Sequence, residues 1–443
     1  MEINISYKRI WSIAYPIILG SVAQNLINVT DTAFLGRVGE VELGASALGG
    51  MFYFVLFMLA LGFGTGTQII ISRRNGEGNS HMIGKTFDHA IYFMLPLSVF
   101  SFLILYFFSA PILRAVIDSD QIFQASKDFL DFRMYGIFFA VAQVLFRSFY
   151  IGISQTQVIT WSTLVMAVVN IILDYGLIFG KLGLPEMGIK GAALASTIAE
   201  FVAVVYLYGY VLYKNHHKKF SLFCFEKYDK GLFNRNFQLA YPIMFQNFLS
   251  LSVWFAFFLI VEKLGEQALA ISNIIRSVYI VLMIPIWGFA SAANSMVSYL
   301  IGMRKQDFVF ILIKRIVLMA MASVGLLVLL SQAVPEAILR IYTNDPDLIL
   351  NSIPVLKVVS LSSIFLASGF VFFNGVMGTG KTNVSFLIEL LVLLLYIAYV
   401  YVLINFFGAN VTMAWTSEIV YGILLTSFSW LYLLKGRWAL IKI

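Results

Sequence analysis

The sequence predicts an all-α integral membrane protein of about twelve transmembrane helices, arranged as two six-helix bundles, on the strength of two observations. Hydrophobic residues make up 60% of the 443 residues, charged residues make up 12%, and the mean hydropathy is +0.87. A soluble chain of this length needs more polar surface than such a composition supplies. The second observation is an internal repeat, because the sequence matches itself after a displacement of 226 positions.

The repeat opens with Ala14-Tyr15-Pro16-Ile17, which returns as Ala240-Tyr241-Pro242-Ile243. The same displacement, without a gap, pairs Gly39 with Gly265, Gly62-Phe63 with Gly288-Phe289, Ser72 with Ser298, Gly76 with Gly302, Leu113-Arg114 with Leu339-Arg340 and Gly152 with Gly378. Duplicated hydrophobic units are the plan of many membrane transporters, in which the substrate site lies between the repeats.

A bilayer core of about 30 Å needs roughly 20 apolar residues per helix, and about twelve such stretches occur. They lie near 9–35, 46–72, 86–110, 124–150, 157–180, 188–213, 236–262, 268–300, 309–333, 348–374, 383–407 and 411–434. An even number in each copy gives both copies the same orientation, so we expect pseudo-two-fold symmetry along the membrane normal. The predicted domains are an N-lobe at 1–213, a cytoplasmic linker at 214–235 and a C-lobe at 236–443.

Lys and Arg gather on one side of these stretches. That side holds Lys8, Arg9, Arg73, Arg74, Lys85, the basic residues of 214–235, Arg304, Lys305, Lys314, Arg315, Lys381, Lys435, Arg437 and Lys442. The positive-inside rule therefore predicts cytoplasmic N- and C-termini in a plasma membrane, for which we expect a bacterial inner membrane. The net charge of +7 then needs no nucleic-acid partner. The first stretch carries Gln24, Asn25, Asn28 and Asp31, so it is interpreted as a retained helix rather than a signal peptide.

Three local patterns are not expected to carry chemistry. Residues Gly375–Thr382 match the phosphate-loop pattern G-x-x-x-x-G-K-[ST], but that pattern binds phosphate between a strand and a helix. Membrane spans flank it here, so we expect a cytoplasmic turn and no nucleotide. The adjacent His216 and His217 offer only two metal ligands, and the single Cys224 excludes an intramolecular disulfide.

Polar side chains inside the apolar stretches mark the candidate site, since an ionisable group in a membrane helix is costly and usually functional. Gln24, Asn28 and Asp31 recur at steps of four and three, which places them on one helical face. Asn170 and Asp174 are four apart in the stretch 157–180. At 1.5 Å per residue both carboxylates fall in the outer half of the bilayer. We predict a cation site there.

Two interpretations of that site compete. Carboxylate and amide oxygens suit a hard cation such as sodium, whereas two carboxylates in a low-dielectric cavity share a proton. Either provides a coupling ion, Na⁺ or H⁺, and no other cofactor is implied. A third possibility is structural, in which Asp31 and Asp174 cap helix ends or face lipid headgroups.

Other charges lie inside the predicted spans. Glu200 is a candidate for binding substrate or a proton, against an ion pair within its lobe. In the C-lobe, Glu418 is expected either to pair with Arg276 or Lys357 or to gate substrate. Glu389 is expected to reach the cytoplasmic interface from its helix.

Aromatic and proline residues add weaker signals. Flat cationic compounds bind aromatic and Met side chains through apolar burial and cation–π attraction. The candidates for such contacts are Trp254, Phe257, Met283 and Trp287. Pro16 and Pro242 each remove a backbone donor and can bend the helices at 9–35 and 236–262.

The residues resemble a known family. The duplicated six-span plan, the Ala-Tyr-Pro opening, Asn28-Val29-Thr30-Asp31-Thr32, Asn170-Ile171-Ile172-Leu173-Asp174 and Gly191-Ala192-Ala193-Leu194-Ala195-Ser196 are similar to those of multidrug and toxic compound extrusion (MATE) transporters. The resemblance implies a V-shaped pair of six-helix bundles that exchanges sodium ions or protons for cationic, aromatic drugs. It also implies a cation site of Asp31, Asn170 and Asp174, with Ser196 supplying a hydroxyl where the family has Thr.

One departure bears on the subtype. NorM-type members carry a glutamate in the middle of the seventh span, but 248–260 has no acid and Glu262 is interpreted as a surface residue. The chain therefore resembles the DinF-type more closely. We expect a monomeric Na⁺- or H⁺-coupled antiporter, in contact with membrane lipids, that exports cationic or aromatic compounds by alternating access.

Two rival functions remain open. A lipid-linked oligosaccharide exporter of the same superfamily is expected to have a cationic central cavity, whereas the N-lobe here is acidic. A membrane-embedded enzyme needs a nucleophile or metal cluster within the spans. The four histidines, His81, His89, His216 and His217, all lie in or near predicted cytoplasmic segments. No enzyme activity is expected.

Overall fold

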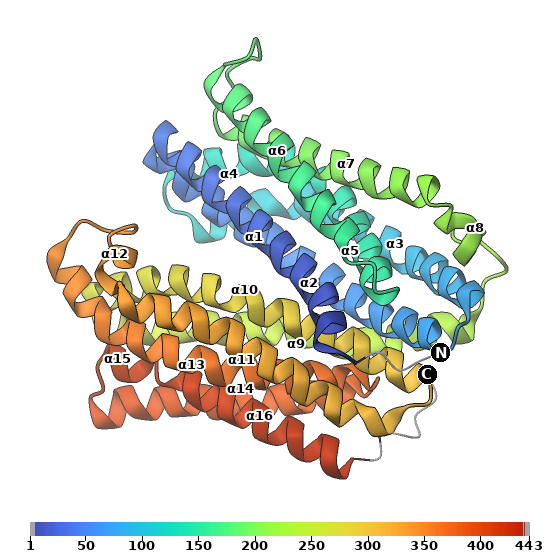
Figure 1. Cartoon of the computed structure of the whole chain (residues 1–443). Coiled ribbons are helices and arrows are strands. Elements are labelled where there is room, and N and C mark those ends of the chain that lie inside the picture. Colours follow the sequence, from blue (N-terminus) through green and yellow to red (C-terminus); the bar gives the residue numbers. More distant parts are fainter. Residues whose placement is uncertain (1–4, 437, 439–443) are drawn as a thin grey trace. The chain divides into compact units, whose positions relative to one another are not determined.

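The structure is a computed structural model that describes residues 5–436 and 438, and every regular element in that part of the chain is helical (Figure 1). Eleven helices are long and apolar enough to cross a membrane. A twelfth span is a bent pair, α4 (Asp120–Arg133) and α5 (Gly136–Gly152), whose axes differ by 54°. The prediction of an all-α membrane protein with about twelve spans is confirmed.

Contacts group the chain into two compact units, which we name the N-unit (Leu19–Met244) and the C-unit (the described residues up to Ile18 and from Phe245). The N-unit holds most of α1 (Tyr7–Val38), then α2 (Glu40–Gly76), α3 (Ser80–Val116), α4, α5, α6 (Gln157–Phe179), α7 (Ile189–Tyr213), α8 (His216–Phe220) and the first part of α9 (Lys230–Glu262). The C-unit holds the rest of α1 and α9, with α10 (Glu266–Gly302), η1 (Gln306–Phe308), α11 (Val309–Ala333), α12 (Pro335–Leu339), α13 (Pro346–Gly378), α14 (Thr382–Phe407), α15 (Val411–Ala414) and α16 (Ser417–Lys435). The predicted domain boundaries at 213 and 236 stay a prediction.

Repeated glycines explain why α1 and α9 each contribute to both units. Within the N-unit, a Cβ atom added to Gly62 of α2 would lie 2.6 Å from the Cα of Met244 in α9. Within the C-unit, a Cβ atom on Gly288 of α10 would lie 2.4 Å from Cγ1 of Ile18 in α1. Gly62 and Gly288 are partners in the sequence repeat. Ile18 and Met244 are repeat partners too, so the repeat preserves a close contact in which the absence of a Cβ atom leaves room for the facing residue.

Pro16 and Pro242 lie inside continuous helices α1 and α9. Each is two residues before the point at which its helix passes from one unit to the other, at Ile18 and Met244. Proline removes one backbone hydrogen bond and crowds the preceding turn, so these are the places where each helix bends most easily. That the two helices bend during transport stays a prediction.

The chain between α7 and α9 is fastened to the beginning of α3, within the N-unit. The Asp88 carboxylate accepts hydrogen bonds from the backbone N–H groups of Phe223, at 2.8 Å, and Phe225, at 2.9 Å. A Cβ atom on Gly84 would lie 2.0 Å from the carbonyl oxygen of Phe220, so glycine is required for this approach. The predicted linker is therefore a packed segment rather than a free tether.

His89, the residue after Asp88, binds the same segment at a point closer to the start of α9. Its Nδ1 lies 2.8 Å from the carbonyl oxygen of Lys85, and its Nε2 accepts the backbone N–H of Asp229 at 2.9 Å. These partners place the ring proton on Nδ1 and leave the imidazole neutral. Hydrogen bonding from the backbone N–H of Leu232, and then from Lys85, lowers the pKa of the exposed Asp229 carboxyl. The Asp229 carboxylate thus begins α9 as a helix cap.

Substituting Asp88→Ala should release the segment, because two backbone N–H groups lose a charged acceptor. Limited trypsin digestion of the purified protein should then cleave after Lys227 at least about tenfold faster, which corresponds to about 1.4 kcal/mol of opening free energy. His81→Ala is the control: it breaks only an exposed pair with Glu226 and should change cleavage little. Equal cleavage of Asp88→Ala and the parent would contradict the fastening.

The phosphate-loop pattern lies between two helices, as expected. α13 ends at Gly378 and α14 begins at Thr382, with Gly380 in the turn at a φ of 87°. In the described part of the chain a helix rather than a strand precedes it, so the strand–loop–helix unit that presents N–H groups to a phosphate is missing.

His216, the first of the paired histidines, is buried in the short helix α8. Its ring is surrounded by those of Phe149, Tyr150, Tyr210 and Phe220. Burial, and then the charges of Lys219 and Lys214, lower the pKa of the imidazole. This histidine is therefore a neutral packing residue.

Candidate functional site

The candidate site begins with two carboxyl groups in the N-unit. Asp31 of α1 and Asp174 of α6 lie within hydrogen-bonding reach of each other. Asp174 is fully buried, and its two oxygens and Oδ1 of Asp31 have no hydrogen-bond donor in good geometry. Buried carboxyl oxygens without donors are stabilised by a proton or by a bound cation.

Neutral oxygen groups adjoin the carboxyl pair. Asn170, which is also buried, lies beside Asp174, and its Nδ2 donates to Oγ of Ser196 in α7 at 3.4 Å. This bond leaves Oδ1 of Asn170 without a donor of its own. The arrangement supplies two carboxyls, one amide oxygen and one hydroxyl, which are ligands that a hard cation accepts.

Close packing of α6 on α7 holds these groups in place. A Cβ atom on Gly191 would lie 2.6 Å from the carbonyl oxygen of Leu177, so the helices meet backbone to backbone there. Elsewhere along the same two helices, Ala167 of α6 and Ala199 and Ala203 of α7 form a small core with Ile27 of α1. The small residues in the Gly-Ala-Ala-Leu-Ala-Ser sequence therefore serve to bring α7 against α6.

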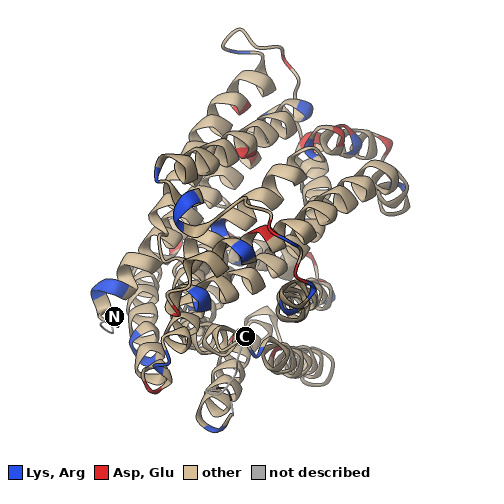
Figure 2. Ribbon diagram, turned by 90° about the vertical axis from the view of Figure 1, so that its right-hand side faces the viewer, with Lys and Arg blue, Asp and Glu red and all other residues tan. Residues whose placement is uncertain are grey.

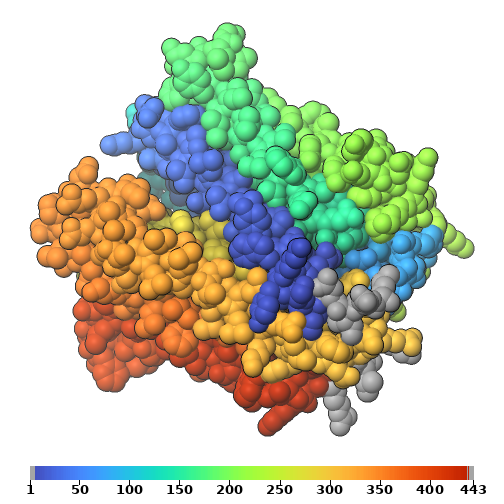
Figure 3. All heavy atoms as spheres, in the orientation of Figure 1, coloured from blue at the N-terminus to red at the C-terminus, as the bar shows by residue number. Residues whose placement is uncertain are grey.

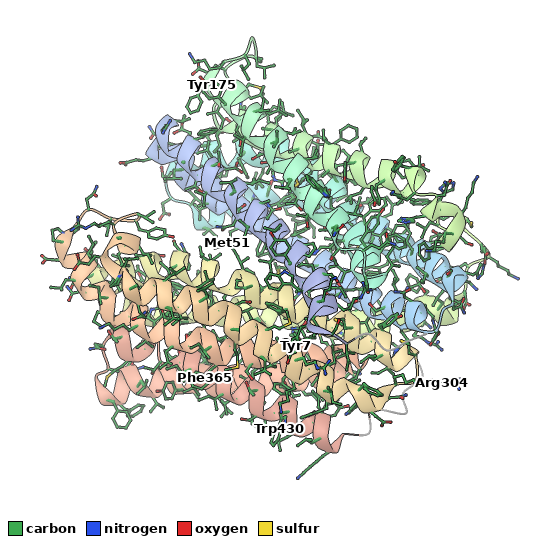
Figure 4. The ribbon with its side chains drawn as sticks, viewed as in Figure 1. Tyr7, Met51, Tyr175, Arg304, Phe365 and Trp430 are labelled. Atoms are coloured by element: carbon green, nitrogen blue, oxygen red, sulfur yellow. The ribbon has the colours of Figure 1, made fainter. Side chains whose placement is uncertain are left out.

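Not every predicted residue joins this cluster. Gln24 and Asn28 are exposed on α1, and among the described residues no hydrogen bond links their side chains to the carboxyl pair. The backbone oxygen of Asn28 accepts the hydroxyl of Thr32 at 2.7 Å. Tyr175, which follows Asp174, lies toward the end of α6 that leads into the 180–188 loop (Figure 4).

Glu200 forms an ion pair with Arg133, a partner that the sequence analysis did not name. Arg133 donates from Nη1 to Oε2 of Glu200 at 2.8 Å and from Nη2 to Oε1, so the pair is bidentate. The guanidinium also lies 4.0 Å from the centre of the Tyr53 ring. Both charged side chains are only 13% and 14% exposed. Of the two interpretations of Glu200, pairing within its lobe agrees with the structure.

Arg133 occupies the break in the fourth span. It is the last residue of α4, and α5 begins at Gly136. A Cβ atom on Gly136 would lie 2.1 Å from Nη1 of Arg133, so a side chain there would displace the guanidinium. The sequence predicts one continuous span at 124–150, and its composition gives no sign of the break beside this buried arginine. The signal was an Arg followed closely by Gly at the start of an uncharged run.

The expected ion pair in the C-unit is wrong. Glu418 accepts the hydroxyls of Tyr279 and Tyr396, each at 3.1 Å. Arg276 instead lies over the Phe258 ring, 5.5 Å from its centre, and Lys357 is exposed. Depth along the helix alone did not reveal that tyrosine hydroxyls, rather than either cation, reach Glu418.

The expectation for Glu389 is also wrong, since it does not reach the interface. Its side chain is buried, and one carboxyl oxygen accepts the hydroxyls of Ser250 and Tyr421, each at 2.8 Å. Figure 2 shows that Asp, Glu, Lys and Arg are sparse along the helices.

The four predicted aromatic and Met contacts divide into two kinds. Phe257 and Met283 are buried, and the Phe257 ring packs against Trp415 with centroids 5.1 Å apart. Trp254 is half-buried and Trp287 is 44% exposed. A role in substrate binding stays a prediction for all four, and it fits the two tryptophans better.

A family model described as MatE matches residues 16–176 and 242–426, two segments that begin at the repeat partners Pro16 and Pro242. The chain is 25% identical to the probable multidrug resistance protein NorM of Thermotoga maritima, with 97% of this chain and 93% of that protein covered. It is 26% identical to the protein of the same name from Agrobacterium fabrum, over 77% and 73% of the two chains.

Solved structures agree in fold. A transporter of the MOP superfamily from Pyrococcus furiosus superposes with a TM-score of 0.89 at 16% identity, covering 96% of this chain and 94% of that chain. An outward-facing multidrug resistance MATE family transporter of the MOP superfamily gives the same values. The family model spans most of both repeats, so the chain belongs to the MatE family, that of the multidrug and toxic compound extrusion transporters.

Proposed function

We propose that this chain is a cation-coupled antiporter that exports small cationic or aromatic organic compounds across the plasma membrane. The single observation that carries the coupling is the pair of carboxyl groups of Asp31 and Asp174, whose buried oxygens have no donor. The NorM names of the relatives support drugs as the cargo. The proposal includes a monomer with both termini in the cytoplasm and no enzyme activity. It keeps the DinF-type arrangement, because the C-unit part of α9 has no acid before Glu262.

Coupling follows from the cost of a buried charge. With the site empty of cation, two ionised carboxyls repel each other in a medium of low dielectric, so uptake of a sodium ion or a proton is favourable. Neutralising Asp31 changes the charge of α1, the helix whose first part belongs to the C-unit. The proposed consequence is a shift of the equilibrium between inward- and outward-open states. A charge that crosses 100 mV supplies about 2.3 kcal/mol.

Stability in sodium and in an equal concentration of choline, at two pH values, tests the site. Sodium bound by the folded state should raise the free energy of unfolding, by about 2.7 kcal/mol at 100 times the dissociation constant. Asn170→Ala should lose most of this gain, because the amide oxygen beside Asp174 is removed. Asn405→Ala, an exposed amide at the end of α14, is the matched control and should keep it.

The outcomes separate the two coupling ions. A proton-only site gives the same stability in sodium and choline but a stability that changes with pH. If neither salt nor pH distinguishes Asn170→Ala from the parent, the cation site is wrong.

A further inference from the structure

In the C-unit, two buried glutamates lie on neighbouring helices, and each accepts a hydrogen bond from a tyrosine of the other helix. Glu389 of α14 accepts the hydroxyl of Tyr421 in α16, and Glu418 of α16 accepts the hydroxyl of Tyr396 in α14. The two tyrosine rings also touch, with centroids 5.9 Å apart and planes at 79°. The two carboxyl groups are therefore linked through one pair of packed tyrosines.

Two further helices complete the surroundings. Ser250 of α9 donates to Glu389, and Tyr279 of α10 donates to Glu418. Both glutamates are almost fully covered, with 3% and 2% of their surface exposed. Oε2 of Glu389 has no hydrogen-bond partner at all. The helices α10, α11, α13, α14 and α16 pack against one another and are coloured yellow to red in Figure 3.

Cations do not approach either acid. Among the described residues no Lys, Arg or His nitrogen lies within the 4.0 Å of an ion pair with Glu389 or Glu418. The remaining charged or titratable groups on the helices packed around them in the C-unit are Glu262, Glu266, Arg276, Tyr299, Asp347, Lys357, Tyr399, Tyr401, Tyr432 and Lys435. Arg276 lies over Phe258 and the hydroxyl of Tyr399 bonds to Thr416, while Lys357 is exposed. Within the described part of the chain, the hydrogen-bond partners of the two acids are therefore hydroxyl groups.

A hydroxyl partner allows a carboxyl group to change its protonation state, whereas an arginine partner opposes that change. A guanidinium only donates, so Arg133 holds Glu200 in its ionised form. A tyrosine hydroxyl both donates and accepts, so it can bond to an ionised carboxylate and, after rotating, to a protonated carboxylic acid. The hydroxyl groups around Glu389 and Glu418 can thus keep a hydrogen bond to the carboxyl group in either protonation state.

The sequence repeat relates the helices of this cluster to the helices of the cation site in the N-unit. Displacement by 226 positions carries Asn170 to Tyr396, Tyr53 to Tyr279 and Gln24 to Ser250. The helices that supply the N-unit site, α1, α6 and α7, correspond to α9, α14 and α16. Corresponding helices of the two repeats therefore carry buried polar side chains, although the residues differ.

We propose that Glu389 and Glu418 form a second site in this protein, which binds protons and releases them during transport. Each carboxylic acid gives its proton to water, and the resulting carboxylate keeps the hydroxyl hydrogen bonds that surround it. The ligand is the proton and not a metal ion, because the pair reaches no third carboxylate or imidazole in the described structure. The inference rests on the proposed antiport, since only a transporter would use such a site in each cycle.

Infrared difference spectroscopy of the purified full-length protein tests the site without requiring transport. The carbonyl stretch of protonated carboxylic acids is followed while the pH is changed from about 5 to about 9, a range in which buried carboxyls titrate. We expect part of this band to disappear as the pH rises, and Glu389→Gln and Glu418→Gln each to remove a share of the change. Glu262→Gln, exposed at the end of α9, is the control and should remove nothing in the band of the buried acids.

A second measurement asks whether the site serves transport. Proton movement per tetraphenylphosphonium exported is measured in proteoliposomes, and the double variant Glu389→Gln/Glu418→Gln should lower this ratio by at least one half. A band that is the same in the parent and both single variants, or one that does not change with pH, would overturn the proposal, as would an unchanged ratio. If no variant or parent transports tetraphenylphosphonium while the infrared result holds, the proposed function fails and the proton site stands.

Discussion

Asp174→Asn should abolish coupled efflux while the protein stays folded and abundant. The substitution keeps the volume of the side chain and deletes the charge, so the packing of α6 on α7 is retained. Asp174 is fully buried beside Asp31, and an amide in its place neither takes up a proton nor supplies the negative charge that holds a sodium ion. Uptake of ethidium into inverted vesicles, driven separately by sodium and pH gradients, should fall at least tenfold, which is about 1.4 kcal/mol or more in coupling. Asp31→Asn should have the same effect.

Asp347→Asn is the matched control, since it makes the same chemical change at an exposed position in the first turn of α13. It should transport ethidium like the parent. If Asp31→Asn and Asp174→Asn both pump at the parental rate under either gradient, the N-unit carboxyls do not couple transport.

The sequence predicted the span pattern well because hydropathy and repetition act over tens of residues. Eleven long helices and one bent pair match the twelve apolar stretches. The bend itself was missed, since a break of two residues between Arg133 and Gly136 leaves the hydropathy of the span almost unchanged. Short-range geometry of this kind depends on a tertiary contact, here the ion pair with Glu200.

The candidate site was predictable in part. Helical spacing places Asn170 and Asp174 on one face, and the structure brings that face to Asp31. The same spacing also placed Gln24 and Asn28 with Asp31, yet both are exposed. Periodicity fixes which residues share a stripe along a helix, but the tilt of the neighbouring helix decides how much of that stripe is covered.

Partners of single buried charges could not be predicted from one sequence. Glu418 was expected to meet a cation, but a tyrosine hydroxyl serves equally well as a donor and gives no charge signal. Arg133 is a second example, because its sequence neighbours do not reveal that it faces Glu200, which is 67 residues away. Such assignments require the direction of each side chain, which depends on helix rotation rather than on composition.

Arg133→Met should destabilise the protein by about 3–5 kcal/mol, because it leaves the Glu200 carboxylate buried without its partner. Glu200→Met should cost a similar amount by stranding the guanidinium over Tyr53. The double variant Arg133→Met/Glu200→Met should recover most of the loss, since two apolar side chains of similar length replace the pair and need no partner. The free energy of unfolding of all four proteins in the same detergent, combined as a double-mutant cycle, measures the coupling.

Arg114→Met is the control for this cycle, since Arg114 pairs with Asp120 at a site where their side chains are 53% and 85% exposed. An exposed pair contributes at most about 1 kcal/mol, so this variant should unfold close to the parent. The loss of unfolding free energy in Arg133→Met should be several-fold larger than the loss in Arg114→Met. If Arg133→Met unfolds like Arg114→Met, or if the double variant is as unstable as the sum of the single variants, the pair does not hold α4 and α5 against α7.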